Sequence, residues 1–414
     1  MVSASWDAPL QLLRQSGSMQ NYDVLVIGAG PGGSSAARFS ARHGLKTLMI
    51  EKRPDIGSPV RCGEGVSRAW MSDYGVKPNV HWISDEVKGA RIYGPSERRP
   101  ITLTAENAGN EVGFVIERDK FDKEMAALAA EEGADVWVKS PALSVIKEDG
   151  KVSGARIRHN GQMVDIHAKM VIAADGFESE FGRWAGLKSI ILAKNDIISC
   201  IEYRMIGVDS DVDYTDFYLG SIAPAGYIWV FPKGEKEANV GIGVTISAMN
   251  DRWDVRNYLD NWIKNHPGYA KGRTIQQITG GVSVSKVRDK FTLPGLLLVG
   301  DAARLIDPIT GGGIANAYVS GSYAADVAKQ AIEANDFSQE MMNRYEKLVK
   351  NKFQRKHLRN WIAKEKLGKL SDDNLDKLVD IISEVKMTEI SVEEILKAIQ
   401  AKYPEMVKEL EELI

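Results

Sequence analysis

Three glycines stand at a spacing that suits the binding of a phosphate-containing cofactor. Gly28, Gly30 and Gly33 form a G-x-G-x-x-G pattern, which on its own is a weak signal because the same spacing also arises by chance. Here the pattern directly follows the apolar run 22–27, and the next apolar run ends at the acidic residue Glu51. This context predicts the strand, turn, helix and second strand of a dinucleotide-binding unit.

Each part of this unit has a separate task in binding a dinucleotide. Gly28 permits the tight turn, Gly30 lets the pyrophosphate approach the backbone, and Gly33 lets the helix pack closely on the sheet. The start of the helix offers free N–H groups and the positive end of its dipole to the phosphates. The Glu51 carboxylate can accept hydrogen bonds from ribose hydroxyls. The alternative interpretation is a glycine turn with a purely structural role.

A second glycine-rich segment, far along the chain, distinguishes between the dinucleotides that share this turn. Residues 300–303, Gly-Asp-Ala-Ala, follow the apolar run 296–299, and the run 308–313 places three glycines before a predicted helix. These residues supply further backbone donors and one carboxylate, Asp301, where the ribityl chain and ring of a flavin could lie. A nicotinamide cofactor needs no such second segment, so the sequence favours FAD.

The composition is that of an ordinary globular protein with more than one domain. The chain has 414 residues, of which 44% are hydrophobic and 26% are charged, and its formal net charge is -3. This length suits two packed domains, and the charge gives no general reason to expect nucleic-acid binding. No apolar run approaches the roughly 18 to 20 residues that a membrane-spanning helix needs.

Cysteine and histidine give no sign of a disulfide framework or a metal site. The two cysteines, Cys62 and Cys200, are too few for a framework of disulfides or a four-thiolate zinc site. The six histidines show no metal-ligand spacing. We therefore expect a chain from a reducing compartment, cytoplasmic by default, that holds no metal.

The order of the expected elements predicts an α/β (α+β) fold. Strand patterns, interrupted by a helix at 120–132, dominate residues 86–250, and helix patterns dominate residues 314–414. We expect a Rossmann-like FAD-binding domain, an antiparallel-sheet substrate domain and a C-terminal helical region. The expected division is 1–18 for a leader or an added segment, 19–85, 110–185 and 285–335 for the discontinuous FAD-binding domain, 86–109 and 186–284 for the β-rich substrate domain, and 336–414 for the helical region.

Two further motifs resemble those of a known flavoprotein superfamily. Residues 174–176, Ala-Asp-Gly, followed by Ser179 and Arg183, are similar to its Asp-Gly motif, although the Ser-to-Arg spacing is looser here. Residues 117–121, Glu-Arg-Asp-Lys-Phe, are similar to a helix start whose arginine, here Arg118, contacts the cofactor. With the two glycine-rich segments, these motifs make nearly the whole chain resemble the superfamily of p-hydroxybenzoate hydroxylase.

Two more segments narrow the resemblance to one family. Residues 224–232, PAGYIWVFP, match a P-x-x-Y-x-W-x-F-P motif, and residues 61–65, RCGEG, match a Cys-Gly segment. Both are typical of the geranylgeranyl reductase family, and the chain is most similar to its archaeal digeranylgeranylglycerophospholipid reductases. The resemblance implies an FAD-dependent reductase that hydrogenates the isoprenoid double bonds of geranylgeranyl chains in archaeal ether phospholipids, within membrane lipid biosynthesis.

The family resemblance also implies which residues contact FAD. Ala142 would lie near the adenine, Asp301 on the ribityl chain, and Gly313 and Ile314 beside the isoalloxazine. The expected cofactor-binding residues are Gly28, Gly30, Gly33, Glu51, Lys52, Arg61, Cys62, Gly63, Gly65, Arg118, Ala142, Asp175, Gly176, Asp301, Gly312, Gly313 and Ile314.

An alternating aromatic run supplies the expected substrate site. Tyr227, Trp229 and Phe231 project from one face of a strand, since side chains alternate along it. An aromatic face can line a tunnel for a long apolar chain, although the same pattern also occurs in an ordinary core. The resemblance favours the tunnel, with Pro232 as a further substrate contact.

Reduction of a polyprenyl double bond needs both a hydride and a proton, because the bond carries no electron-withdrawing group. Dry aromatic walls would orient the chain and exclude water and oxygen. Cys62 is the first candidate to donate or position the proton, since Arg61 and nearby glycine N–H groups could shift the pKa of its thiol. The alternative for Cys62 is a small packing residue, which is also the role we expect for Cys200. Tyr227 is the second candidate donor.

Other functions and partners remain open at this point. The same fold hosts flavin monooxygenases and halogenases, but the halogenase W-x-W-x-I-P motif is replaced here by the Tyr, Trp, Phe run. A lipid-chain carrier that uses FAD only structurally is a third interpretation. The external electron donor is open between a ferredoxin and NAD(P)H, since the chain holds no second G-x-G-x-x-G but relatives of this fold bind NADPH without one.

The charge changes sign along the C-terminal part of the chain. Residues 344–369 hold 10 Lys and Arg against 2 Glu, whereas residues 371–414 hold 5 Lys against 12 Asp and Glu. The basic stretch also carries apolar residues such as Leu348, so it could make peripheral contact with an anionic membrane. The alternative is a solvated face that pairs with the acidic tail. Ser371 and the box 391–394 have the pattern of helix N-caps.

Overall fold

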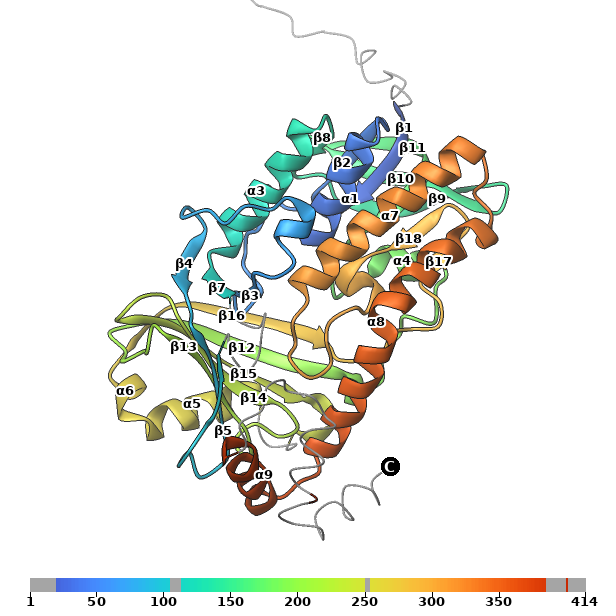
Figure 1. The fold of residues 1–414 in the computed structure, drawn as a ribbon. Helices are drawn as coiled ribbons and strands as arrows, with labels where there is room; N and C mark the ends of the chain where they lie inside the picture. The colour runs from blue at the N-terminus through green and yellow to red at the C-terminus, as the bar shows by residue number, and fades with distance from the viewer. Residues whose placement is uncertain (1–19, 105–112, 250–253, 385–399, 401–414) are drawn as a thin grey trace, which may run out of the picture.

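Two large β-sheets dominate the computed structural model, which describes residues 20–104, 113–249, 254–384 and 400 (Figure 1). The expected leader at 1–18 and the N-cap box at 391–394 lie outside the described residues. One sheet carries the glycine-rich turn and is flanked by helices, and the other is largely antiparallel.

The first sheet has a parallel centre. In the described residues it has eight strands: the order β17-β18-β11-β1-β2-β8 forms the main path, and β10 and β9 extend it from the first half of β11. Strands buried on both faces are rich in apolar residues, and Val24, Leu25 and Val26 are fully buried. The strands are β1 (Gln20–Ile27), β2 (Thr47–Ile50), β8 (Asp135–Trp137), β9 (Ala142–Glu148), β10 (Lys151–His159), β11 (Gln162–Ala173), β17 (Thr292–Leu293) and β18 (Leu296–Leu298).

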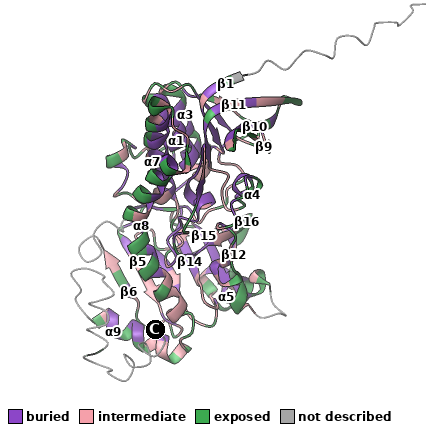
Figure 2. Cartoon of the chain, turned by 90° about the vertical axis from the view of Figure 1, so that its right-hand side faces the viewer, coloured by how far each residue is buried: buried purple, intermediate pink, exposed green. Residues whose placement is uncertain are grey.

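Helices pack on this sheet and on one another. A Cβ atom at Gly321 would lie 2.3 Å from the carbonyl oxygen of Gly32, so the two helices that carry these glycines approach closely. Figure 2 shows the buried central strands behind helices whose outer faces are exposed. The helices are α1 (Pro31–Arg42), α3 (Arg118–Glu131), α4 (Glu180–Trp184), α7 (Ile314–Ala334) and α8 (Gln339–Leu367).

The second sheet is antiparallel except for one parallel pair, β13 and β5. Its strands in the described residues follow the order β16-β12-β15-β14-β13-β5-β6. One face packs on α5 through Tyr258, Leu259 and Trp262. The elements are β5 (Gly89–Tyr93), β6 (Ile101–Thr104), β12 (Ile197–Ile206), β13 (Tyr214–Tyr218), β14 (Tyr227–Pro232), β15 (Glu237–Thr245), β16 (Arg273–Ser283), α5 (Val255–Asn265), α6 (Pro267–Ala270) and α9 (Asp372–Glu384), which packs on β6.

A small sheet of three described strands, in the order β3-β7-β4, lies beside the start of α3. Trp82 and Phe121 form its core with Phe114, in edge-to-face ring contacts. Its strands are β3 (Gly65–Ser67), β4 (Ile83–Glu86) and β7 (Gly113–Ile116), and short 3₁₀ helices occur at Ser72–Tyr74, Lys194–Asp196, Ile246–Ala248 and Gly300–Ala303.

The α/β fold class and its three parts agree with the expectation from the sequence. The helix expected at 314–334 is α7, and the one expected at 120–132 is α3, which begins two residues earlier. Within the described residues, neither large sheet takes a strand from segments assigned to the other, and we propose the expected domain division on that ground. None of the described helices combines the length and the apolar character that a bilayer crossing requires.

A buried ion pair fastens the small sheet to the end of β14. The fully buried Lys233 ammonium donates to Glu64 Oε2 and lies 3.2 Å from Glu117 Oε1. Glu64 Oε2 also accepts from the Asn239 side-chain amide at 2.8 Å. Buried charges are tolerated when they are paired and hydrogen-bonded. These contacts therefore hold the loop 61–65 against the second sheet.

Replacing Lys233 by Met should lower the free energy of unfolding by about 3–5 kcal/mol, because Glu64 keeps a buried negative charge without its cation. Lys236→Met is the matched control. The Lys236 ammonium also forms an ion pair, with Asp209 at 3.0 Å, but its side chain is 71% exposed, and such pairs contribute about 0–1 kcal/mol. Urea unfolding of both variants measures the difference. Equal losses of stability would contradict the importance of the buried pair.

Candidate active site

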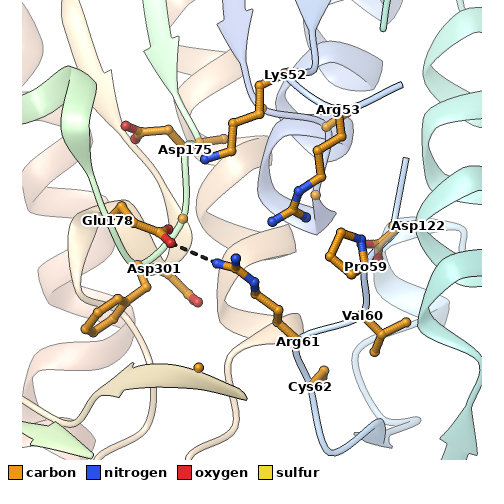
Figure 3. A pocket seen from close by; sticks show the side chains of 18 of the residues that line it. Lys52, Arg53, Pro59, Val60, Arg61, Cys62, Asp122, Asp175, Glu178 and Asp301 are labelled. Atoms are coloured by element: carbon orange, nitrogen blue, oxygen red, sulfur yellow. Dashed lines mark hydrogen bonds and ion pairs between the residues drawn. The ribbon is translucent and has the colours of Figure 1, made fainter. Parts of the chain in front are cut away.

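A cavity of about 320 Å³ opens between the two large sheets (Figure 3). It begins at the glycine-rich turn after β1 and ends at β12, β14 and β16 of the second sheet. Ligands of open α/β sheets bind beyond the carboxyl ends of parallel strands, and the cavity lies there. All the expected cofactor-binding residues line it except Gly33, Gly65, Gly312, Gly313 and Ile314.

The glycine-rich turn leaves room where a phosphate would lie. Gly28 has a left-handed φ of +100°, and a Cβ atom at Gly33 would lie 1.8 Å from the carbonyl oxygen of Gly28. At Gly30 no atom beyond the residue itself and its two chain neighbours lies within 4 Å of the position a Cβ would take. Helix α1 begins at Pro31 without a side-chain cap or an acidic residue in its first turn. Its first N–H groups are therefore suited to an anionic ligand.

Three of the carboxyl groups that line the same cavity belong to expected cofactor-binding residues, Glu51, Asp175 and Asp301. Glu51 is fixed at the end of β2, where its two oxygens accept from the backbone N–H groups of Ala29 (3.1 Å) and Arg53 (2.9 Å). Asp175 Oδ2 accepts from Phe181 N–H at 2.8 Å, whereas its buried Oδ1 has no hydrogen-bond partner in the described part of the chain. Burial raises the pKa of Asp175 and of Asp301. The hydroxyl groups of a ligand could donate hydrogen bonds to the carboxyl groups of Asp175 and Asp301.

Basic side chains approach the cavity from the loop after β2. Lys52 and Arg53 extend into it in Figure 3. The Arg61 guanidinium reaches across to Glu178, to which it donates at 2.9 Å. These three cations give one wall of the cavity a positive character that suits a pyrophosphate.

The environment of Cys62 differs from the one expected. The expectation was that Arg61 would shift the pKa of the thiol, but Arg61 faces Glu178. The cation near Cys62 is Arg118, whose guanidinium also pairs with Asp122 at 2.9 Å. Burial raises the pKa of the Cys62 thiol in spite of Arg118. The thiol is therefore a neutral group of the cavity wall.

The floor of the cavity is the face of the second sheet opposite α5. In the register of β14, β15 and β12, Trp229 lies opposite Gly241, and Gly241 lies opposite Glu202. A Cβ atom at Gly241 would lie 2.2 Å from the Trp229 ring. Glycine at this position therefore lets the indole lie over β15 and reach Glu202 on the next strand.

The three aromatic residues of β14 share this face, as expected. The ring centroid of Trp229 lies 6.0 Å from that of Tyr227 and 6.5 Å from that of Phe231. Phe217 of β13 adds a fourth ring, 5.4 Å from Tyr227. Of these four rings, Trp229 lines the cavity itself. Pro232, expected with them, alternates to the opposite face, where its partner in the register is the buried Ala238.

Tyr227 and Cys200 form the next row across the sheet, with Gly243 between them. The Tyr227 hydroxyl donates to the carbonyl oxygen of Thr310 at 2.5 Å, so its proton is directed at the glycine-rich loop 308–313. Cys200, expected to be a packing residue, lines the cavity. Burial raises the pKa of its thiol to about 12, which keeps it neutral.

Sequence reasoning missed Glu202. Glu202 is 3% exposed and lines the cavity, and its Oε2 accepts a hydrogen bond from the Trp229 indole N–H at 2.7 Å. Burial, opposed by that hydrogen bond, raises the pKa of Glu202 to about 8. A signal was present, because Cys200, Glu202 and Arg204 alternate along a strand and so share one face. Among the described residues, no cluster of three or more His, Cys, Asp or Glu is placed to hold a metal.

The remaining expected cofactor residues do not line the cavity. A Cβ atom at Gly65 would lie 2.9 Å from the Phe231 ring, so this glycine makes room for the aromatic face. Gly312, Gly313 and Ile314 lie at the start of α7, and a Cβ atom at Gly313 would lie 3.2 Å from Asp301 Oδ1. Their contact with a cofactor stays a prediction.

Comparisons with known proteins connect this arrangement to one group of enzymes. A sequence profile described as the geranylgeranyl reductase catalytic domain matches residues 196–282, and a profile of NAD(P)-binding Rossmann-like domains matches residues 26–81. The digeranylgeranylglycerophospholipid reductase of Picrophilus torridus is 79% identical over 394 residues, which cover 95% of this chain and 99% of the relative. That of Thermoplasma acidophilum is 72% identical, over 96% of this chain and 100% of the relative.

Solved structures show the same similarity. The crystal structure of a geranylgeranyl bacteriochlorophyll reductase-like protein from Thermoplasma acidophilum superposes with a TM-score of 0.91 at 72% identity, covering 96% of this chain and 100% of that one. A flavin-dependent brominase superposes with a TM-score of 0.67 at 18% identity, covering 95% of this chain and 93% of that one. The second likeness shows a shared fold.

Gly30 and Gly33 of the glycine-rich turn should respond differently to replacement by alanine. Gly30→Ala should fold with a stability within about 1 kcal/mol of the original, since its Cβ enters open space. It should bind FAD at least about tenfold more weakly, because the methyl lies where the phosphate would approach. Quenching of FAD fluorescence measures the affinity, and calorimetric unfolding measures the stability.

Gly33→Ala is the matched comparison on the same turn. Its Cβ would meet the Gly28 carbonyl oxygen at 1.8 Å, so we expect a loss of more than about 3 kcal/mol or failure to fold. A Gly33→Ala protein as stable as the original, or a Gly30→Ala protein with unchanged FAD affinity, would contradict the roles assigned to the turn.

Proposed function

This chain belongs to the digeranylgeranylglycerophospholipid reductase family, and we propose from that membership that it hydrogenates the isoprenoid double bonds of geranylgeranyl chains in archaeal ether phospholipids with FAD. A relative that is 79% identical over 99% of its own length carries that name. The observation that carries the proposal is that one cavity joins a dinucleotide-binding turn to an aromatic face and a buried acid. Such a reductase is an oxidoreductase of membrane lipid biosynthesis.

The residues of the cavity fit FAD. The uncapped start of α1 and the open position at Gly30 suit the pyrophosphate, and Glu51 is placed for a ribose. The partnerless oxygen of Asp175 and the buried carboxyl of Asp301 suit hydroxyl groups farther along the cofactor. We propose that these residues and the rest of the expected cofactor set hold FAD. When bound and reduced, the flavin supplies the hydride and both electrons for the reduction.

The chain's own residues position the substrate and keep the site dry. Phe217, Tyr227, Trp229 and Phe231 offer an apolar face for an isoprenoid chain. An isolated double bond offers no polar handle, so the shape of this face must align it. We propose that Tyr227 also holds the loop 308–313, through its hydrogen bond to Thr310.

We propose that Cys62 is a catalytic residue of the same cavity or controls the entry of substrate into it. Its neutral thiol lines the cavity beside Gly63, and a Cβ atom at Gly63 would lie 3.1 Å from the Trp229 indole nitrogen. The loop that carries Cys62 therefore lies directly against the aromatic face. We propose that a substrate chain runs along this face past Cys62, whose small side chain lines the cavity.

The reductase activity can be tested without knowing the electron donor. FAD-loaded protein is reduced chemically under anaerobic conditions and incubated with unsaturated digeranylgeranylglyceryl phospholipid. Mass spectrometry should show lipid masses that rise in steps of two hydrogens. No change in mass, with the flavin oxidised only when oxygen is admitted, would contradict the reductase and favour a flavin monooxygenase.

Because the proposed substrate is a membrane lipid, the enzyme needs to contact a membrane, and α8 offers a suitable surface. Leu348, Lys352, Arg355, Arg359 and Ile362 follow one another at helical spacing of four and three residues, and all are exposed. Basic and apolar side chains on one face suit an anionic membrane surface. We propose that this basic face of α8 contacts the membrane that contains the substrate.

Three of the described acidic residues that follow α8 support this choice over pairing with the acidic tail. Asp372 and Asp376 accept hydrogen bonds from Ser221 and Ser96, on the side of the second sheet. Glu384 lies 3.8 Å from Arg99 on the same side. These carboxylates are therefore engaged away from the basic face of α8.

Reversal of two charges on α8 tests the membrane contact. Arg355→Glu with Arg359→Glu should reduce co-sedimentation with vesicles that contain anionic lipid, because each basic residue near the surface contributes about 1 kcal/mol. Lys264→Glu with Arg273→Glu is the control, since these exposed residues belong to α5 and to the start of β16 and not to α8. Equal binding of the original chain to neutral and anionic vesicles would contradict the proposal.

A further inference from the structure

We propose that Glu202 donates the proton that completes each double-bond reduction, an inference that rests on the proposed function. Neither the family resemblance nor the expected residues singled it out. Its position, its hydrogen bonds and its electrostatic surroundings each support the role.

The position of Glu202 meets the geometric requirement for a proton donor. It lies on β12 in the floor of the cavity, between Gly241 of β15 and Ile278 of β16 in the register. A Cβ atom at Gly63 would lie 3.5 Å from Glu202 Oε2. The carboxyl group therefore lies between the aromatic strand and the loop of Cys62, where a substrate chain passes in the proposed function.

The hydrogen bonds of Glu202 decide which oxygen carries the proton. The Trp229 indole N–H can only donate, and it donates to Oε2 at 2.7 Å. Oε2 is therefore the acceptor oxygen, and in the neutral carboxylic acid the proton belongs to Oε1. Within the described chain Oε1 is buried and has no hydrogen-bond partner. This acidic O–H is thus not used in a hydrogen bond of the described chain, on a residue that lines the cavity.

The surroundings keep the carboxyl group neutral near neutral pH and still able to ionise. Burial, with the nearby Glu64 carboxylate, raises the pKa of Glu202 to about 8. The Trp229 hydrogen bond, Lys233 and Arg204 act in the opposite direction and stabilise the carboxylate left after donation. A general acid works best with a pKa near the working pH.

Three other titratable groups near the aromatic face, Cys62, Cys200 and Tyr227, are poorer donors. Burial raises the pKa of Cys62 above its ordinary value and that of Cys200 to about 12. The Tyr227 hydroxyl donates its proton to the Thr310 carbonyl oxygen, and burial raises its pKa as well. Of these groups, Glu202 is the strongest acid that is still protonated at neutral pH.

The step balances in atoms and electrons. The π bond of the alkene breaks, one carbon receives a hydride with both electrons from the reduced flavin, and the other carbon receives the proton from Glu202 Oε1. The electron pair of the broken O–H bond stays on the carboxylate. The alkene is reduced and the flavin oxidised by two electrons. Glu202 regains a proton from water, and the second proton of the reduced flavin is released to water.

Glu202→Gln tests the proposal with a side chain of nearly the same shape. The amide oxygen can still accept from Trp229, but the amide cannot donate a proton to carbon. Asp260→Asn is the matched control, because Asp260 accepts from Tyr203 of the same strand at 2.9 Å on the face packed against α5. Cys62→Ala tests the alternative donor.

Single-turnover reduction of the lipid by the chemically reduced holoenzyme gives the first readout. Glu202→Gln should slow it by about 100-fold or more, the scale of general acid catalysis, with FAD affinity unchanged. The rate of the original enzyme should fall as the pH rises through about 8, because the carboxylate cannot donate, and the variant should lose this dependence. Asp260→Asn should keep both the rate and the pH profile.

Infrared difference spectroscopy gives a second readout that does not depend on turnover. The original protein should show the C=O stretch of a protonated carboxylic acid at pH 7, lost on titration through about pH 8 and absent in Glu202→Gln.

A Glu202→Gln enzyme within about threefold of the original rate would overturn the proposal. A Glu202 carboxyl group that is already ionised at pH 6 would also overturn it. So would a Cys62→Ala enzyme whose single-turnover rate falls as much as expected for Glu202→Gln. An original enzyme that reduces no lipid at all would instead contradict the proposed function.

Discussion

The buried ion pair between Lys233 and Glu64 joins the two walls of the cavity. Glu64 belongs to the loop of Cys62 and has a left-handed φ of +73°, which a residue other than glycine adopts only when its surroundings impose it. Its carboxylate is held by Lys233, by the Asn239 amide and by the backbone N–H of Arg118. The second sheet, the Cys62 loop and the start of α3 are thereby fixed to one another.

The same buried charges determine the chemistry that the cavity can support. Lys233 lies directly after the aromatic strand, so the pair that fixes the loop also fixes Trp229 with respect to it. Both partners of this pair interact electrostatically with Glu202: Glu64 raises the pKa of Glu202, and Lys233 lowers it. Glycine at 241 then brings the indole and the carboxyl into contact. Stability and proton transfer thus depend on one set of residues.

Local patterns predicted the dinucleotide turn and the aromatic face, because each depends on residues close together in the sequence. The glycine spacing and the alternation of Tyr227, Trp229 and Phe231 are of this kind. Strand alternation put Glu202 on one face with Cys200 and Arg204, but its contact with Trp229 was not predictable. The ion pair of Lys233 and the position of Arg118 beside Cys62 were not predictable either, since all three contacts join segments far apart in the chain. Pro232 was expected from its motif to contact substrate, and strand alternation places it on the face opposite the three aromatic residues.

Anaerobic reoxidation of the flavin by the lipid is the sharpest test of the proposed reductase activity, because it reports electron transfer from the flavin to the lipid. Chemically reduced, FAD-loaded protein is titrated with digeranylgeranylglyceryl phospholipid while the flavin absorbance is recorded. We expect oxidised flavin to appear on mixing, one equivalent for each double bond reduced. A flavin that stays reduced with excess lipid until oxygen is admitted would contradict it.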